Sequence, residues 1–192
     1  MTNQGKNAID VVLAESLKEL AVTRPIDKIT IKEITDRAGV IRPTFYNHFQ
    51  DKYELLEWIV EKELMEPAMP LFDNGMLREG ITFLLTSMER EKGFYCKASR
   101  LEGQNSFPEI LKKKVSAAVQ KYFDVDKLKE QVPFSWLTTE LIADFYAEAI
   151  CYVAIDWARD GMTIPIQELT EVYLILIQKS VIDILGKTGE TT

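Results

Sequence analysis

The chain has 192 residues, of which 46% are hydrophobic and 10% aromatic, and its formal net charge is −7. This composition is enough for a substantial buried core and excludes a chain that is disordered over most of its length. No apolar run approaches the roughly 20 residues of a membrane-spanning helix, and the first ten residues lack the apolar stretch of a signal peptide. Cys96 and Cys151 stand alone, without disulfide or metal-ligand spacing. We therefore expect a cytoplasmic protein with no metal, cofactor or membrane partner.

The charge is distributed unevenly along the chain. Residues 1–52 contain eight Lys or Arg and seven Asp or Glu, whereas residues 53–192 contain 15 basic and 23 acidic residues. The acidic excess thus lies entirely in the second part, and the first part remains compatible with a polyanionic partner. An acidic second part would also repel DNA and weaken binding to random sequence.

Helical periodicity dominates, and no alternating strand pattern is found, so the sequence predicts an all-α fold of about nine helices. A capping pattern at Thr30–Glu33 begins the second helix, and Gly39 ends it. Asp51 is expected to cap the fourth helix, Pro67 to end it, and a loop to follow over 69–75. The expected helices, in chain order, cover 6–22, 31–38, 42–49, 52–66, 76–91, 94–101, 107–123, 138–160 and 165–185.

Residues 31–56 carry the most specific pattern: two short helical segments on either side of a Gly turn, followed at once by another helix. In the second segment, Phe45, His48 and Phe49 fall on one arc. Arg42, Pro43, Tyr46 and Asn47 fall on the opposite arc, which the core leaves free. This arrangement is typical of a helix-turn-helix whose second helix enters the DNA major groove.

Candidate DNA contacts follow from the chemistry of these side chains. Arg42 could donate two hydrogen bonds to a guanine edge or clamp a phosphate, and Asn47 could read adenine or hold the backbone. The hydroxyls of Thr44 and Tyr46 suit phosphate oxygens. For each side chain the alternative is ordinary surface or helix-end packing, and His48 is expected to be packed or to touch phosphate rather than to bind metal. The complete predicted set is Thr30, Arg42, Pro43, Thr44, Tyr46, Asn47, His48 and Lys52.

The segment AGVIRPTFYNHFQDKYEL, residues 38–55, resembles the N-terminal signature of TetR-type transcriptional regulators. The matching positions are Ala38, Gly39, Val40, Thr44, Tyr46, His48, Phe49 and Lys52, and the resemblance extends over about residues 6–65. It implies an all-helical homodimer, with a DNA-binding domain over 1–52 and a ligand-binding and dimerisation domain over 53–192. Two positions depart from the pattern. Ile41 replaces the usual Ser or Thr cap, and Pro43 replaces a frequent Gly, so DNA binding is expected to be weaker or differently targeted.

The second part of the chain offers candidates for an effector pocket and a dimer interface. Aromatic residues crowd its middle, and those predicted to line a pocket for an unknown small-molecule effector are Phe94, Tyr95, Phe145, Tyr146 and Tyr152. Small residues recur along the 138–160 helix, where they allow close helix approach, either within one subunit or between two. The residues predicted for the dimer interface are Ala143, Ala147, Cys151, Ala154, Val172 and Leu176.

Two functions remain open, and a third is excluded. The first is a TetR-like repressor that binds double-stranded operator DNA and is released by a small molecule. The second is a co-activator that acts through a protein partner with weak or no DNA binding of its own. The stretch Tyr46–Trp58 resembles such regulators, including those of dihydroxyacetone kinase operons. An enzyme is not expected, because one histidine, two scattered cysteines and no phosphate-binding Gly loop assemble no catalytic set.

Overall fold

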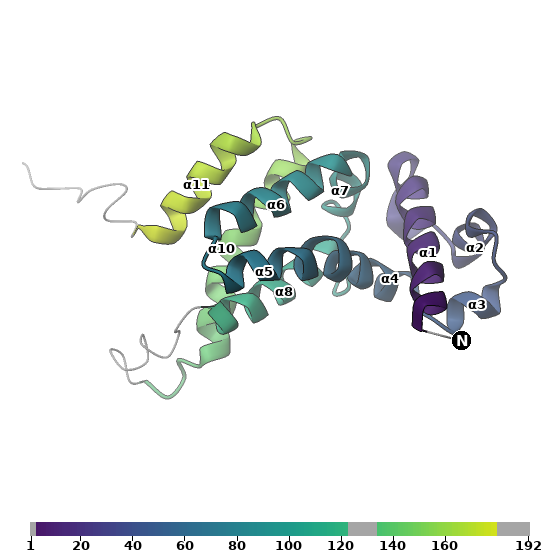
Figure 1. Ribbon diagram of the computed structural model, residues 1–192, viewed down its shortest axis with the longest axis horizontal. Coiled ribbons are helices and arrows are strands. Elements are labelled where there is room, and N and C mark those ends of the chain that lie inside the picture. The colour runs from purple at the N-terminus through teal and green to yellow at the C-terminus, as the bar shows by residue number, and fades with distance from the viewer. Residues whose placement is uncertain (1–2, 123–133, 180–192) are drawn as a thin grey trace, which may run out of the picture.

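A computed structural model describes residues 3–122 and 134–179, and all regular structure within these ranges is helical (Figure 1). Helices α1 (Asn3–Thr23), α2 (Ile31–Ala38) and α3 (Arg42–Tyr46) gather at one end of the molecule, with a short 3-10 turn, η1 (Ile26–Lys28), before α2. Both α1 with α2 and α2 with α3 are packed together. The predicted second helix is confirmed at both ends.

The fourth helix does not end at Pro67. Instead, α4 (Lys52–Ile59) continues through a π-helical segment, η2 (Val60–Met65), into α5 (Glu66–Asp73), and the three form one rod that leads into the body. Pro67 is the second residue of α5, lies within this rod and has no N–H to donate. The wider π-helical turn resets the hydrogen-bond pattern directly before it. The predicted loop over 69–75 is therefore wrong, and the turn begins only at Asn74.

The remaining helices agree closely with the predicted ones. They are α6 (Leu77–Arg90), α7 (Lys92–Ala98), α8 (Phe107–Tyr122), α10 (Thr139–Arg159) and α11 (Ile166–Gln178). Helix α8 lies along α10, and α11 packs on α6. The predicted loop over 124–135 and the predicted end of the last helix near 185 fall largely outside the described residues. With α4, η2 and α5 counted as one rod, the described ranges hold nine helices, so the predicted all-α class is confirmed.

One continuous hydrophobic core runs through the described residues, from Leu13 in α1 to Leu174 in α11. Phe45 of α3 and Leu55 of α4 belong to it, as do the α7 side chains at the centre of the body. The predicted domain boundary after residue 52 thus lies at the start of α4, and the core crosses it; the boundary itself stays a prediction. None of the described helices is long and apolar enough to span a membrane.

Candidate DNA-binding surface and its connection to the body

Helix α2 begins with a complete capping box. The Thr30 hydroxyl accepts a hydrogen bond from the Glu33 backbone N–H at 3.3 Å, and the Glu33 carboxylate accepts one from the Thr30 backbone N–H at 2.9 Å. Arg24 donates to the same carboxylate at 2.7 Å. The Arg24 hydrogen bond, followed by those from Thr30, lowers the pKa of Glu33 to about 2. The end of α2 is fixed by Gly39 at φ 68°, so the turn into α3 is defined from both sides.

Helix α3 is shorter than predicted, because regular α-helix ends at Tyr46 and a turn carries the chain to Phe49. Phe45 and Phe49 are buried and hold the helix on the core. Ile41 occupies the N-cap position with no side-chain cap, and 69% of its surface is exposed. Pro43 lies in the first turn. The missing side-chain cap expected at the start of this helix is therefore present, and weaker DNA binding stays a prediction.

The free face of α3 carries four of the predicted DNA contacts. Arg42, Pro43, Tyr46 and Asn47 are exposed, and Thr44 is half-buried. Arg42 has no hydrogen bond or ion pair among the described residues. Every other Lys and Arg whose side chain the structure describes in residues 8–52 has one within the chain. Those others are Lys18, Arg24, Lys28, Lys32, Arg37 and Lys52. The unpaired cation of this part thus lies at the start of the recognition helix.

Lys52, which was predicted to meet phosphate, has its ammonium engaged in hydrogen bonds within the chain. Its ammonium donates hydrogen bonds of 2.8 Å to three backbone carbonyl oxygens around η1, those of Ile26, Asp27 and Ile29. An ammonium has three hydrogens, so these bonds use its donor capacity. Burial lowers its pKa, and the nearby Asp27 and Asp51 carboxylates oppose that effect. In this geometry Lys52 ties the start of α4 to the turn before α2.

His48 is also placed behind the surface. Its side chain is 2% exposed, and its Nδ1 lies 2.6 Å from an oxygen of the buried Asp10 in α1. The imidazole therefore fastens the end of the recognition helix to α1. Its predicted alternative, a packed residue, matches this placement. The partner could not be identified from sequence, because Asp10 lies 38 residues away in a helix whose other residues show only an amphipathic pattern.

Comparison with known proteins agrees with this geometry. Residues 15–59 match the family described as "Bacterial regulatory proteins, tetR family", and residues 76–179, more than half of the chain, match the family described as "Transcriptional regulator C-terminal region". The chain belongs to the TetR family. It is a TetR-family transcriptional regulator and not an enzyme.

Two similar proteins carry related names. The chain is 27% identical over 143 residues to the HTH-type dhaKLM operon transcriptional activator DhaS of Lactococcus lactis subsp. lactis, a match that covers 74% of this chain and 75% of the relative. A solved structure, the dihydroxyacetone kinase operon activator DhaS, superposes with a TM-score of 0.62 at 22% identity. That match covers 88% of this chain and 95% of the other. It shows a shared TetR-type fold.

An ion cluster around the buried Lys18 connects the DNA-binding end of this TetR-family chain to its body. The Lys18 ammonium of α1 lies 3.0 Å from Glu63 in η2, 2.8 Å from Glu15 and 3.6 Å from Glu91, and its side chain is 5% exposed. Burial alone would lower the pKa of Lys18, but the carboxylates around it raise it. Burial, with repulsion from the other two carboxylates, raises the pKa of Glu63.

The Tyr95 hydroxyl is buried and has no hydrogen-bond partner among the described residues.

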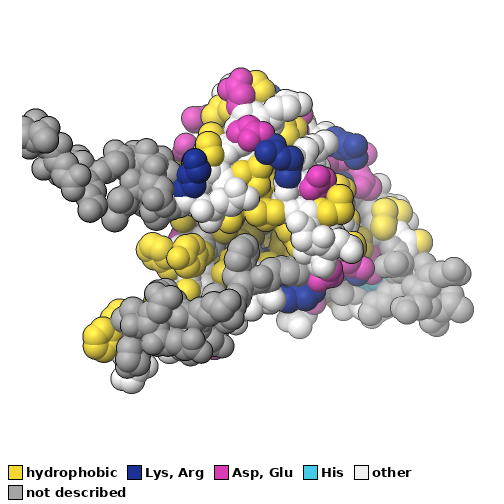
Figure 2. Space-filling view, turned by 60° about the vertical axis from the view of Figure 1, so that its left-hand side comes forward, with side chains coloured by type: hydrophobic (Ala, Val, Ile, Leu, Met, Phe, Trp, Pro, Cys, Tyr) yellow, Lys and Arg dark blue, Asp and Glu magenta, His cyan; other side chains and the backbone are white. Residues whose placement is uncertain are grey.

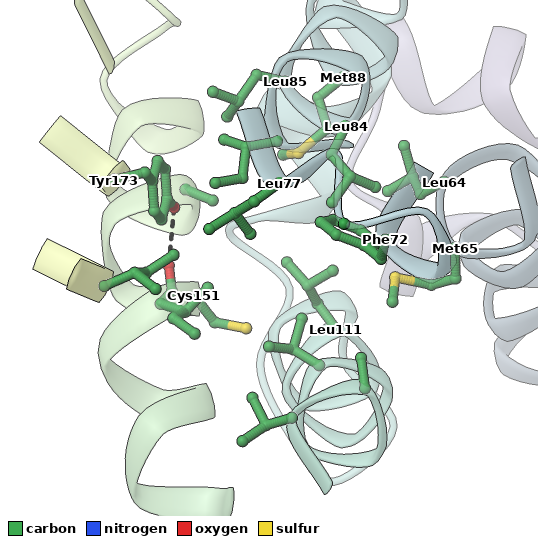
Figure 3. Close-up of a pocket in the computed structure, with 18 residues that line it drawn as sticks. Leu64, Met65, Phe72, Leu77, Leu84, Leu85, Met88, Leu111, Cys151 and Tyr173 are labelled. Carbon is green, nitrogen blue, oxygen red and sulfur yellow. Dashed lines mark hydrogen bonds between the residues drawn. The ribbon is translucent and has the colours of Figure 1, made fainter. Parts of the chain in front are cut away.

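A cavity of about 300 Å³ lies inside the body, and none of the five aromatic residues predicted for a pocket lines it. Phe94 and Tyr95 are buried in the core, whereas Phe145, Tyr146 and Tyr152 lie on the exposed side of α10. These aromatic residues therefore do not line this cavity, and the residues that bind an effector stay a prediction. Aliphatic side chains from the rod and from α6, α8, α10 and α11 form the wall instead (Figure 3). In sequence these residues have the same spacing as core residues, so no signal separated the two.

The small residues of α10 lie inside one subunit. Ala143, Ala147, Cys151 and Ala154 are buried in the helix face that packs on the body, and α8 lies against it. Their small side chains allow α8 and α10 to approach closely, which matches the alternative of packing within one subunit; the dimer interface itself stays a prediction. Among the predicted interface residues, those of α11 are different. Val172 is 44% exposed and Leu176 is 51% exposed.

Proposed function

We propose that this TetR-family regulator binds operator DNA as a homodimer and reads it with the exposed face of α3. The observation that supports this is the joint exposure of Arg42, Tyr46 and Asn47 on one short helix, which a capped α2 and a buried Phe45 hold in place. Arg42 would donate to a guanine edge or a phosphate, and Asn47 to a base or the backbone. Tyr46, with Thr44, would donate to phosphate oxygens.

The remaining predicted contacts take different places in this proposal. Thr30 is engaged in its capping box, so α2 would approach phosphate through its N-terminal backbone amides rather than through the hydroxyl. Pro43 would contribute shape, since it has no N–H to donate. His48 and Lys52 would position α3 and α4 without touching DNA.

A homodimer is proposed because a helix-turn-helix reads palindromic half-sites through two-fold symmetry. The side of α10 that faces solvent and the neighbouring α11 expose a group of large apolar side chains, which would meet their symmetry copies. These are Leu141, Phe145, Tyr146, Tyr152, Val172, Ile175 and Leu176. Leu176→Glu should therefore shift the protein toward monomer in light scattering. Ile164→Glu, at a similarly exposed position outside this group, should leave the mass unchanged.

Two modes of control compete. In the first, DNA binding represses transcription and an effector in the cavity releases it; the apolar cavity in the body favours this mode. In the second, the protein activates transcription with the help of a protein partner. The names of the similar proteins, both called activators of a dihydroxyacetone kinase operon, favour the second mode, as does the uncapped start of α3.

Selection of genomic fragments by the purified full-length protein, at near-physiological salt, tests the proposal. Recovery of a palindromic site by the wild type, lost in Tyr46→Ala, is the expected result. If Arg42 reads guanine, Arg42→Ala should reduce the discrimination at one base pair by about 1–3 kcal/mol of binding free energy. If Arg42 holds phosphate, the same substitution should weaken binding to all DNA sequences alike. Failure to enrich any site would reject independent DNA reading and favour the partner-dependent activator.

A further inference from the structure

The wall of the cavity is almost entirely apolar. Its wall is built from eighteen residues, and none of them carries a charge. Leu, Ile, Val, Met, Ala and Phe side chains supply nearly all of the surface. The labelled members point toward the same space from the rod, α6, α8, α10 and α11 (Figure 3). The space-filling view shows hydrophobic side chains around a recess in this face, with charged side chains outside it (Figure 2).

Two polar groups reach the wall, and neither is available to a charged ligand. The Tyr173 hydroxyl donates a 2.7 Å hydrogen bond to the Ile150 backbone carbonyl, and the dashed line in Figure 3 marks this bond. Burial raises the pKa of the Cys151 thiol to about 12, so it is neutral at physiological pH. A ligand ion placed here would lose its hydration and meet no opposite charge, which carries a large free-energy penalty.

The volume sets the size of the occupant. An apolar cavity of about 150 Å³ is large enough for benzene, so a volume of about 300 Å³ accommodates roughly a dozen non-hydrogen atoms. We propose that the cavity is a binding site for an uncharged apolar molecule of that size, an alkyl-aromatic or short aliphatic compound. This excludes charged effectors, including the cationic ones that the acidic surface of the body would otherwise suggest.

The same wall contains the part of the rod that contacts the DNA-binding end. Leu64 and Met65 of η2 line the cavity, and the residue before them, Glu63, holds Lys18 of α1. A π-helical turn holds about one residue more than an α-helical turn, and such turns are frequent at functional sites. An occupant pressing on Leu64 and Met65 would therefore move Glu63 and, with it, α1. The regulatory consequence rests on the proposed function, whereas the binding itself does not.

Calorimetric titration of the full-length protein with n-butylbenzene, without DNA, tests the site. 4-Phenylbutyrate and 4-phenylbutylammonium serve as charged analogues of similar shape. We expect one n-butylbenzene per chain and at least tenfold weaker binding of both ions. Equal binding of either ion would overturn the assignment to uncharged ligands. Absence of n-butylbenzene binding to the wild type would overturn the site.

A matched pair of variants locates the binding. Ala118 faces the cavity from α8, and its neighbour Ala117 faces solvent. Ala118→Phe should abolish n-butylbenzene binding, and Ala117→Phe should leave it unchanged; the reverse would place the site elsewhere. If Ala118→Phe does not fold, Val115→Thr puts a hydroxyl into the wall at nearly constant volume and should weaken binding severalfold. Measuring DNA affinity with and without n-butylbenzene then tests, separately from ligand binding, whether the ligand changes DNA binding.

Discussion

The Lys18 ammonium of α1 lies 3.0 Å from both carboxylate oxygens of Glu63 in η2. This pair joins the DNA-binding end to the rod at the point where the rod is π-helical. Because the next two residues line the cavity, one short segment contacts both the ligand space and α1. The two ends of the protein are therefore linked by a partly buried ion pair as well as by apolar packing.

Replacement of Lys18 by Met should remove the cation and leave three carboxylates close together, one of them largely buried. We expect the free energy of unfolding to fall by about 2–3 kcal/mol, the range for a broken buried pair reduced for the exposure of Glu15 and Glu91. Urea denaturation measures it. Lys32→Met, which breaks an exposed pair with Asp36, is the control and should cost under about 0.5 kcal/mol. Equal losses of unfolding free energy in the two variants would show that the Lys18 cluster stabilises the fold no more than an exposed ion pair does.

Lys52→Met should separate positioning from phosphate contact. The three lost hydrogen bonds to carbonyls around η1 should destabilise the protein by about 2 kcal/mol. DNA affinity should fall, yet the slope of log affinity against log salt should stay the same, because no phosphate contact is removed. Salt titration by fluorescence anisotropy measures that slope. A decrease of the slope by about one unit would mean that Lys52 does reach phosphate.

Ile41→Ser should strengthen the recognition helix. Ile41 has extended backbone angles suited to an N-cap, and a serine hydroxyl there could share the Thr44 N–H, which already donates to the Ile41 carbonyl at 2.9 Å. Thermal or urea unfolding should show a gain of about 1 kcal/mol, and DNA affinity should rise with it. Ile41→Ala removes the same exposed side chain without adding a cap. If both variants gain the same stability, the gain comes from removal of the isoleucine side chain and not from capping by the serine hydroxyl.

The capping box of α2 should make stability depend on acid. The pKa of Glu33 is about 2 in the folded chain against an ordinary value of 4.5, so its contribution is complete above pH 4.5 and is lost as the pH falls toward 2. Carboxyl carbon shifts followed by NMR should titrate near pH 2. In Arg24→Met the midpoint should move up toward 4.5, since the first cause of the shift is gone. Titration of the wild type near 4.5 would contradict the hydrogen bonds described.

Sequence patterns predicted local features well and long-range partners poorly. The capping box, the Gly39 turn and the Asp51 cap of α4 depend on neighbouring residues and are present as predicted. The end of the fourth helix was wrong, because Pro67 was weighed without the π-helical turn that precedes it. The roles of His48 and Lys52 depend on groups 23 to 38 residues away, which no local pattern contains.

The interior of the body shows the same limit. Alanines and a cysteine spaced along α10 favour close helix approach, but the spacing does not say whether the neighbouring helix belongs to the same subunit. Likewise, aliphatic residues that line a cavity and those that fill a core follow identical helical periods. Only the packing of α6, α8, α10 and α11 around a space that their side chains leave empty distinguishes them.

Because the core continues from α1 into the body, the DNA-binding part of this protein cannot easily be exchanged with that of another regulator. Helix α1 buries Leu13 and Leu17 against the rest of the molecule and directs Lys18 toward Glu63 and Glu91. A segment ending at residue 52, transplanted onto the body of another regulator, would carry that cation away from its carboxylates. New specificities in such a chain are therefore expected to arise through substitutions on the exposed face of α3, rather than by exchange of the DNA-reading segment as an independent cassette.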